Sequence, residues 1–194
     1  LSPLYDKSLD LLYPHDPAKA KKLLTEAGYP NGVDVTIDAR PQPDWELLAV
    51  QTMVEQWKEA GIRCKINVMP SAQYWENWTK VPFGFTTWAH RPLGTMILAL
   101  AYRTGAAWNE ANWSNPEFDK LLDEAAQASD PAKRDEALKK ANNLLYDDAP
   151  VWFFNYNKAV LAYQPWVHGL QANPTEITHQ YPEDLWVDSR SPAK

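Results

Sequence analysis

The residue types that most often carry catalysis are scattered along this chain of 194 residues. Its four histidines form no HExxH or other paired spacing, and its single cysteine, Cys64, leaves no set of zinc ligands. No GxSxG motif and no phosphate-binding glycine loop occurs. The carboxylate pairs Asp119/Asp123 and Asp147/Asp148 could in principle serve a glycosidase, but their positions predict solvated helix surfaces. We therefore expect no enzyme, no metal and no cofactor.

Two segments carry side chains suited to binding instead. In the first, Trp88 is followed closely by His90 and Arg91. Arg91 offers a planar fork of donors that matches a carboxylate or a phosphate, and Trp88 could stack on a ring or chain of a ligand. Each residue also has an ordinary alternative. Arg91 could pair with an acidic residue of its own domain, Trp88 could be a core residue at a strand end, and His90 could lie on the surface.

The second segment, residues 108–113, combines tryptophan with asparagine. An asparagine side chain both donates and accepts, as sugar hydroxyls and amides require, although asparagine also favours turns. The candidate ligand-binding residues are therefore Trp88, His90, Arg91, Trp108, Asn109 and Asn112.

Composition limits the class of partner. Hydrophobic residues make up 45% and charged residues 23% of the chain, an ordinary balance for a globular domain. The net charge of −6 argues against nucleic acid as the main partner, since phosphate binding needs a basic surface. No apolar stretch approaches the roughly 20 residues of a membrane helix. Ten tryptophans and nine tyrosines are many for this length, and aromatic rings suit both cores and binding surfaces.

Three dipeptides mark the starts of helices: Asp16-Pro17, Asn115-Pro116 and Asp130-Pro131. Each places a side-chain acceptor at the cap and a proline at the first helical position. Apolar residues recur at helical spacing after each start. We expect inward faces made by Ala20, Leu23, Leu24 and Ala27; by Phe118, Leu121, Leu122 and Ala125; and by Leu138, Ala141 and Leu145.

The positioning framework is predicted to be a βαβ unit. Residues 33–39 and 62–68 alternate as half-buried strands on either side of a helix that Asp44 would cap, so the two strands should be parallel. A short helix capped by Ser71 then leads to a third strand at 83–88. Farther along the chain we expect an apolar helical segment at 93–102. The apolar run Val151–Phe154 is predicted to be a strand covered on both faces, with residues 159–163 returning beside it.

Four stretches also make the chain recognisable: Asp16–Gly32 (DPAKAKKLLTEAGYPNG), Gln51–Val68 ending in AGIRCKINV, Asn115–Glu124 (NPEFDKLLDE) and Leu144–Phe154 (LLYDDAPVWFF). In this order they resemble the C-terminal lobe of the extracytoplasmic solute-binding proteins of ABC importers. The branch is bacterial solute-binding protein family 5, which includes peptide-, oligopeptide- and nickel-binding proteins. The resemblance spans roughly residues 13–170.

The resemblance implies an α/β fold that is one lobe of a two-lobed periplasmic-binding-protein-like fold, with a mixed sheet of βαβ units flanked by helices. It divides the chain into an inter-lobe connecting segment (1–14), the C-terminal ligand-binding lobe (15–170) and a mostly irregular tail (171–194). It implies a periplasmic or otherwise extracytoplasmic protein that closes over a small solute and delivers it to an ABC permease. The implied partners are that solute, the N-terminal lobe of the same parent protein and the permease.

In peptide-binding members of the family, the loop after the tryptophan at the end of the third strand carries acidic residues that pair with the peptide's amino terminus. Here that loop has none, and Arg91 stands in it. We therefore expect a solute with an anionic or hydroxyl-rich group, such as a modified amino acid, an opine-like conjugate or a short peptide held differently. The alternative is a self-contained carbohydrate-binding or glycoside-hydrolysing domain. That alternative requires a complete pocket in this chain, whereas a receptor lobe should expose an aromatic face.

Overall fold

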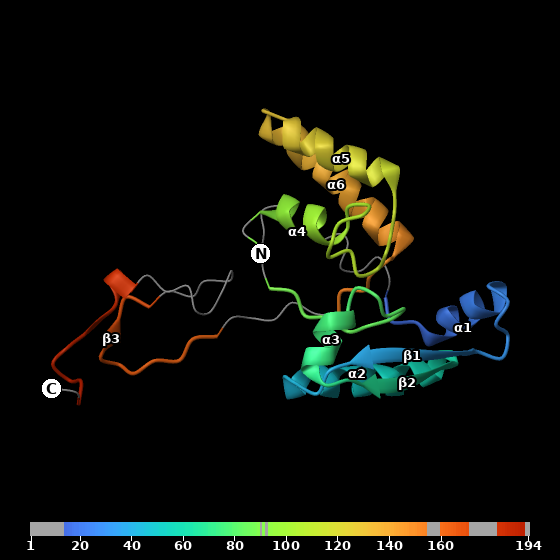
Figure 1. The fold of residues 1–194 in the computed structure, drawn as a ribbon, viewed down its shortest axis with the longest axis horizontal. Helices are drawn as coiled ribbons and strands as arrows, with labels where there is room; N and C mark the ends of the chain where they lie inside the picture. Colours follow the sequence, from blue (N-terminus) through green and yellow to red (C-terminus); the bar gives the residue numbers. More distant parts are fainter. Residues whose placement is uncertain (1–13, 90, 92, 155–159, 171–181, 193–194) are drawn as a thin grey trace.

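The computed structural model describes residues 14–89, 91, 93–154, 160–170 and 182–192. In chain order its elements are α1 (Pro17–Glu26), β1 (Val33–Ala39), α2 (Asp44–Trp57), the 3₁₀ helix η2 (Lys58–Ala60), β2 (Ile62–Val68), α3 (Ser71–Asn77), α4 (Gly94–Ala101), α5 (Pro116–Gln127), α6 (Pro131–Asp148), β3 (Val167–His168), the 3₁₀ helix η3 (Pro182–Asp184) and β4 (Trp186–Val187). Figure 1 shows α1 to α3 gathered around the β1–β2 sheet and α4 to α6 packed together beside it.

All three predicted helix starts are confirmed. The side chains of Asp16, Asn115 and Asp130 accept hydrogen bonds from backbone N–H groups two or three residues farther along, and a proline follows each of them. These bonds satisfy N–H groups that would otherwise lack a partner in the first turn. Two other predicted caps are wrong. Asp44 and Ser71 are the first residues of α2 and α3, and the prolines immediately before them, Pro43 and Pro70, occupy the cap positions.

The central βαβ unit has the predicted strands and direction. β1 and β2 are parallel, with a register that runs from Val33 opposite Ile62 to Ala39 opposite Val68. The connecting helix α2 packs on this sheet, and a shared core fills the space between them. The buried members of that core are Ile37, Ala39, Val50, Met53 and Val54. The α/β class is therefore confirmed.

The predicted third strand is reduced to one parallel bridge between Asp38 and Gly84. Asp38 N donates to Phe83 O at 2.9 Å, and Phe85 N donates to Asp38 O at 3.0 Å. The ladder stops there because Asp38 is the penultimate residue of β1, so residues 86–88 run beyond the end of that strand. The segment 83–88 nevertheless lies beside β1, on the side away from β2.

A second core holds the helical part together. Every residue of the predicted inward faces of α5 and α6 is buried there, with residues of α4 beside them. The inward face predicted for α1 is a different case. No residue of α1 is buried: Ala20 and Leu24 are partly covered, whereas Leu23, 52% exposed, and Ala27 face solvent in the described structure.

The prediction of a doubly covered strand at Val151–Phe154 is wrong. These residues form no strand, and Trp152, Phe153 and Phe154 are 63%, 40% and 39% exposed. The composition of an apolar run does not show whether residues of the same chain pack on it, so the exposure of these side chains could not be predicted. Residues 160–163 form no strand either, and Ala159 lies outside the described residues.

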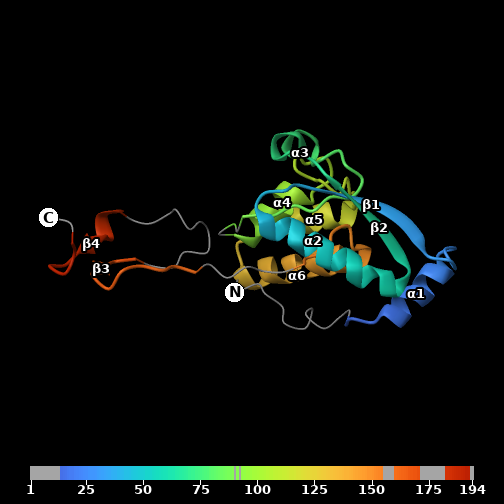
Figure 2. The ribbon, with the colours of Figure 1, turned by 90° about the horizontal axis from the view of Figure 1, so that it is seen from below.

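The C-terminal part forms a small unit of its own. β3 and β4 pair antiparallel, which joins residues on both sides of the boundary expected at residue 170. Figures 1 and 2 show this unit standing apart from the helices and the main sheet.

Most of the proposed connecting segment 1–14, and residues 171–181 of the tail, lie outside the described residues. In the described part of the chain, no helix has both the length and the apolar character needed to cross a bilayer.

Candidate ligand-binding site

The carboxyl ends of β1, β2 and the segment 83–88 lie at one edge of the sheet. Open α/β sheets bind ligands beyond that edge, where the loops after the strands meet. Here these loops supply Arg40 after β1, Met69 after β2 and the residues after Trp88. Of the candidate residues from the sequence, Trp88 and Arg91 therefore lie at this edge.

Arg40 was not among the sequence candidates, and it is the most firmly fixed cation at this edge. Its Nε donates to Glu46 Oε2 at 2.6 Å and its Nη2 donates to Glu46 Oε1 at 2.5 Å. Glu46 is 1% exposed and also accepts a hydrogen bond from the Thr87 hydroxyl. The guanidinium lies 4.5 Å from the ring centroid of Trp75, a cation–π contact. The signal that could have found Arg40 is its place directly after the carboxyl end of a predicted strand.

Four aromatic residues, Trp75, Trp78, Trp88 and Trp108, form what we call the tryptophan cluster. Trp78 is the centre, with ring centroids 5.7 Å from Trp75, 5.7 Å from Trp88 and 6.3 Å from Trp108. Trp88 and Trp108 are 5.9 Å apart, so the two predicted segments do meet. Trp75 and Trp108 remain 40% and 42% exposed, which leaves ring surface for a ligand.

Glu110 ties the tryptophan cluster to the end of segment 83–88. Its Oε1 accepts from Trp88 Nε1 at 2.8 Å and its Oε2 accepts from the Thr86 hydroxyl at 2.5 Å. The hydroxyl of Tyr74, which is fully buried, lies 2.8 Å from the Thr86 hydroxyl and donates to Phe85 O at 2.9 Å. Burial, the largest cause, raises the pKa of Tyr74 to about 12. The phenol is thus neutral at ordinary pH and can act as a donor.

Arg91 is half-buried in the loop that follows segment 83–88. Among the described residues no ion pair or hydrogen bond to its guanidinium is found, so the alternative of an acidic partner within the lobe gains no support there. A guanidinium that meets no anion among the described residues is suited to an anionic group of a ligand. His90 lies outside the described residues, and its role stays a prediction.

The two asparagine candidates occupy different environments. Asn109 is 6% exposed, and its amide nitrogen donates to Arg103 O at 3.2 Å and Trp113 O at 2.7 Å. Its amide oxygen accepts from Trp113 N at 3.3 Å, so both ends of the side chain organise the loop. Asn112 is exposed and takes a left-handed backbone conformation, with φ at 50°. Asn112 is therefore free to reach a ligand, whereas Asn109 positions the loop that carries Trp108.

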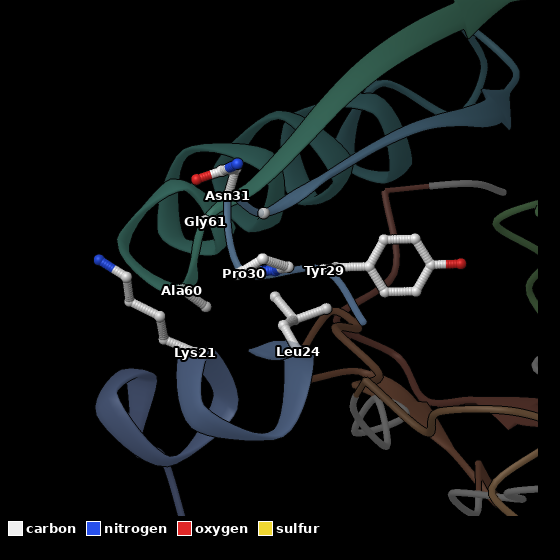
Figure 3. Close-up of a pocket in the computed structure, with 8 residues that line it drawn as sticks. Lys21, Leu24, Tyr29, Pro30, Asn31, Ala60 and Gly61 are labelled. Atoms are coloured by element: carbon white, nitrogen blue, oxygen red, sulfur yellow. The ribbon is translucent and has the colours of Figure 1, made fainter. Parts of the chain in front are cut away.

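Two surface hollows of the described chain lie away from this edge. One, of about 260 Å³, is lined by residues of α1 and of the turns before β1 and β2, including Lys21, Leu24 and Gly61 (Figure 3). It lies at the amino ends of the strands, and Figure 3 shows the ring of Tyr29 turned away from it. The other, of about 380 Å³, lies between α5 and α6. Neither contains a candidate residue, and no metal-binding cluster is found among the residues described.

Exposed aromatic residues extend around the other side of segment 83–88. Phe154 packs 6.0 Å from Phe85, and Trp152 lies 6.3 Å from Trp57. Trp152 and Phe154 are nonetheless substantially exposed. These residues form an exposed aromatic strip on the described chain.

Comparison with known proteins identifies the relatives of this architecture. Residues 1–110 match the family model described as bacterial extracellular solute-binding proteins, family 5 middle. The glutathione-binding protein GsiB of Pectobacterium atrosepticum is 30% identical over 159 residues, which are 73% of this chain and 30% of that protein. The chain thus spans about 30% of the length of the curated relatives that it matches.

Solved structures give the same result. The Agrobacterium tumefaciens R10 protein MoaA, solved with mannopinic acid, is 30% identical, with a TM-score of 0.65 over 70% of this chain and 29% of that one. The putative peptide-binding protein AppA of Clostridium difficile is 20% identical and shows the fold alone. It aligns with a TM-score of 0.82 over 95% of this chain and 40% of that one. The larger alignment shows that most of the chain has a counterpart in a single known fold.

Proposed function

The chain belongs to the bacterial extracellular solute-binding proteins of family 5, and on that premise we propose that it supplies one wall of a solute site in a longer, two-lobed parent protein. Proteins of this family are binding proteins that act outside the cytoplasm. For this chain we propose a non-catalytic role in which the parent protein closes over a small solute and delivers it to an ABC permease. Ligand drives such closure because only the closed state contacts it from both lobes.

The observation that carries the proposal is the half-site at the carboxyl edge of the sheet. At this edge lie Arg91, for which the described residues supply no ion-pair partner, and the exposed rings of Trp75 and Trp108. A cation and exposed aromatic rings at one sheet edge are what a single lobe would contribute as one wall of a site. The family match disfavours the alternative of a self-contained carbohydrate-binding or glycoside-hydrolysing domain.

The proposed solute carries an anionic group for Arg91 and a ring or chain for the tryptophan cluster. Two relatives support this chemistry, since one is named for binding glutathione and another was solved with mannopinic acid. Both compounds carry carboxylates. In the proposed site Trp88, Trp108, Arg91, His90 and Asn112 face the solute, and Asn109 holds the loop in place. The lobe would comprise residues 15–170, with the connecting segment and the tail on either side.

The test starts from the solute that the full-length parent protein retains on purification, identified by native mass spectrometry. Arg91→Ala should then weaken binding of that solute by more than tenfold in isothermal titration, because a charge-assisted contact is lost. Arg134→Ala is the matched control, since Arg134 is an exposed arginine on α6, away from the site. Unchanged affinity in Arg91→Ala would remove Arg91 from the site, and turnover of the solute would contradict the binding role.

A further inference from the structure

The carboxylate of Glu110 ends a chain of donors at the candidate site. The Thr86 hydroxyl has one hydrogen, and the carboxylate of Glu110 can only accept. Thr86 Oγ1 therefore donates that hydrogen to Glu110 Oε2, and the two oxygens are 2.5 Å apart. The Thr86 oxygen can then only accept from the Tyr74 hydroxyl, 2.8 Å away, and the single hydrogen of that phenol is shared with Phe85 O at 2.9 Å. Trp88 Nε1 supplies the other bond, to Glu110 Oε1 at 2.8 Å. Glu110 therefore accepts from Thr86 on one carboxylate oxygen and from Trp88 on the other.

This chain of donors replaces the sheet contacts that residues 86–88 lack. Beyond the Asp38–Gly84 bridge, the segment has no ladder to fix it. Thr86 and Thr87 point to opposite sides, as neighbours in an extended chain do. Thr86 donates to Glu110 in the loop between α4 and α5, and Thr87 donates to Glu46 in α2. Two carboxylates thus hold the segment from both sides.

The indole of Trp88 is oriented by the same arrangement. An indole has a single N–H, and in Trp88 that donor is committed to Glu110. Its ring is then set against Trp78 and Trp108, at centroid distances of 5.7 and 5.9 Å. A solute at this wall would meet the ring surface of Trp88 and could not be recognised through its N–H.

We propose that Glu110 is the positioning residue of the tryptophan cluster: it fixes the orientation of Trp88 and so assigns that ring to stacking rather than to hydrogen bonding. Polar recognition by this wall then rests on other groups, Arg91 in particular. The resulting preference is for solutes that share a charged end and differ in the ring or chain that stacks. This consequence for solutes rests on the proposed function, whereas the orientation of Trp88 does not.

The test uses the full-length parent protein labelled with ¹⁵N only at tryptophan, with the Trp88 indole signal identified by its loss in Trp88→Phe. In Glu110→Ala, exchange of the Trp88 indole hydrogen with solvent should be at least about tenfold faster, a factor that corresponds to about 1.4 kcal/mol. Glu110→Gln keeps the size of the side chain and one acceptor oxygen, so its rate of Trp88 indole exchange should lie between those of the wild type and Glu110→Ala. Glu59→Ala, which removes an exposed glutamate at the far end of the sheet, should leave the rate unchanged.

The Gln variant also provides the result if Glu110→Ala does not fold. Equal Trp88 exchange in wild-type protein and in the folded Glu110 variants would overturn the proposal. The amount of solute retained by the purified protein is measured separately, by native mass spectrometry, and should fall in Glu110→Ala. Wild-type protein that retains no solute but shows the exchange effect would count against the proposed function and leave the role of Glu110 standing.

Discussion

The buried ion pair between Arg40 and Glu46 makes a sharp prediction about stability. Glu46 accepts three hydrogen bonds, and its side chain is 1% exposed, whereas the side chain of Arg40 is 13% exposed. Arg40→Met keeps much of the side-chain bulk over Trp75 but leaves a buried carboxylate with only the Thr87 hydroxyl. Stranding a buried charge in this way costs about 3–5 kcal/mol of the free energy of unfolding.

The reverse change should cost less. Glu46→Leu strands Arg40, but that guanidinium is nearer to solvent and keeps its cation–π contact with Trp75. The double variant Arg40→Met/Glu46→Leu strands neither charge, and apolar replacements of buried pairs are often close to neutral. We therefore expect the double variant to be more stable than Arg40→Met alone.

Equilibrium urea unfolding of the four proteins measures this cycle. The contribution of the pair is the difference between the double variant and the sum of the single variants. The exposed pair Glu136–Lys140, with its atoms 2.8 Å apart, is the matched control and should show a much smaller coupling. Additive costs for Arg40→Met and Glu46→Leu would refute the reasoning, because they would mean that neither side chain depends on the other.

Three further predictions concern the framework of the lobe. Gly32→Ala should prevent stable folding, because φ is +81° and a Cβ would lie 2.1 Å from Gly61 O. Gly28→Ala, with φ at +93° but open space around it, should lower the free energy of unfolding by only about 1 kcal/mol. Thermal melting of the two variants makes the comparison. Asn115→Ala should lower the unfolding free energy by about 1 kcal/mol, measured by urea unfolding, since it removes the cap of α5. In the alkaline range, the absorbance difference near 295 nm between wild-type protein and Tyr74→Phe should show a phenol that ionises at about pH 12. Because the pKa of Tyr74 is higher in the folded than in the unfolded protein, its contribution to the free energy of unfolding is present below pH 10 and falls as the pH rises from 10 to 12. Ionisation of that phenol near pH 10, equal cost in the two glycine variants, or an unaffected Asn115→Ala would each contradict the corresponding prediction.

The sequence predicted the parts of this fold whose causes are local. The cap-and-proline dipeptides beginning at Asp16, Asn115 and Asp130 need only a few neighbouring residues, and all three helices begin where expected. The strands at 33–39 and 62–68 were equally clear, because alternation and a helix of suitable length define a βαβ unit. Local chemistry was sufficient in each case.

The predictions that failed depend on what lies next to a segment in space. Residues 83–88 have the composition of a strand but extend past the end of β1, and no local pattern reports where a neighbouring strand ends. The apolar run Val151–Phe154 signalled burial, yet much of it is exposed, since the sequence does not reveal which body supplies the cover.

The candidate site was predictable only as separate segments. The sequence singled out Trp88 and Trp108, and the structure brings them together. It gave no hint that Glu110 binds the Trp88 indole, because a hydrogen bond between residues 22 positions apart follows from the folded loop alone. For Arg40 the sequence showed only a place directly after a predicted strand, whereas its contacts with Glu46 and Trp75 follow from the fold.

The most direct test of this account is a crystal structure of the full-length parent protein with the solute that it retains on purification. We expect the solute to lie between this lobe and the remainder of the protein, with its anionic group at Arg91 and its ring or chain within about 4 Å of Trp108. A solute enclosed by this chain alone, or one bound elsewhere with the tryptophan cluster untouched, would contradict it.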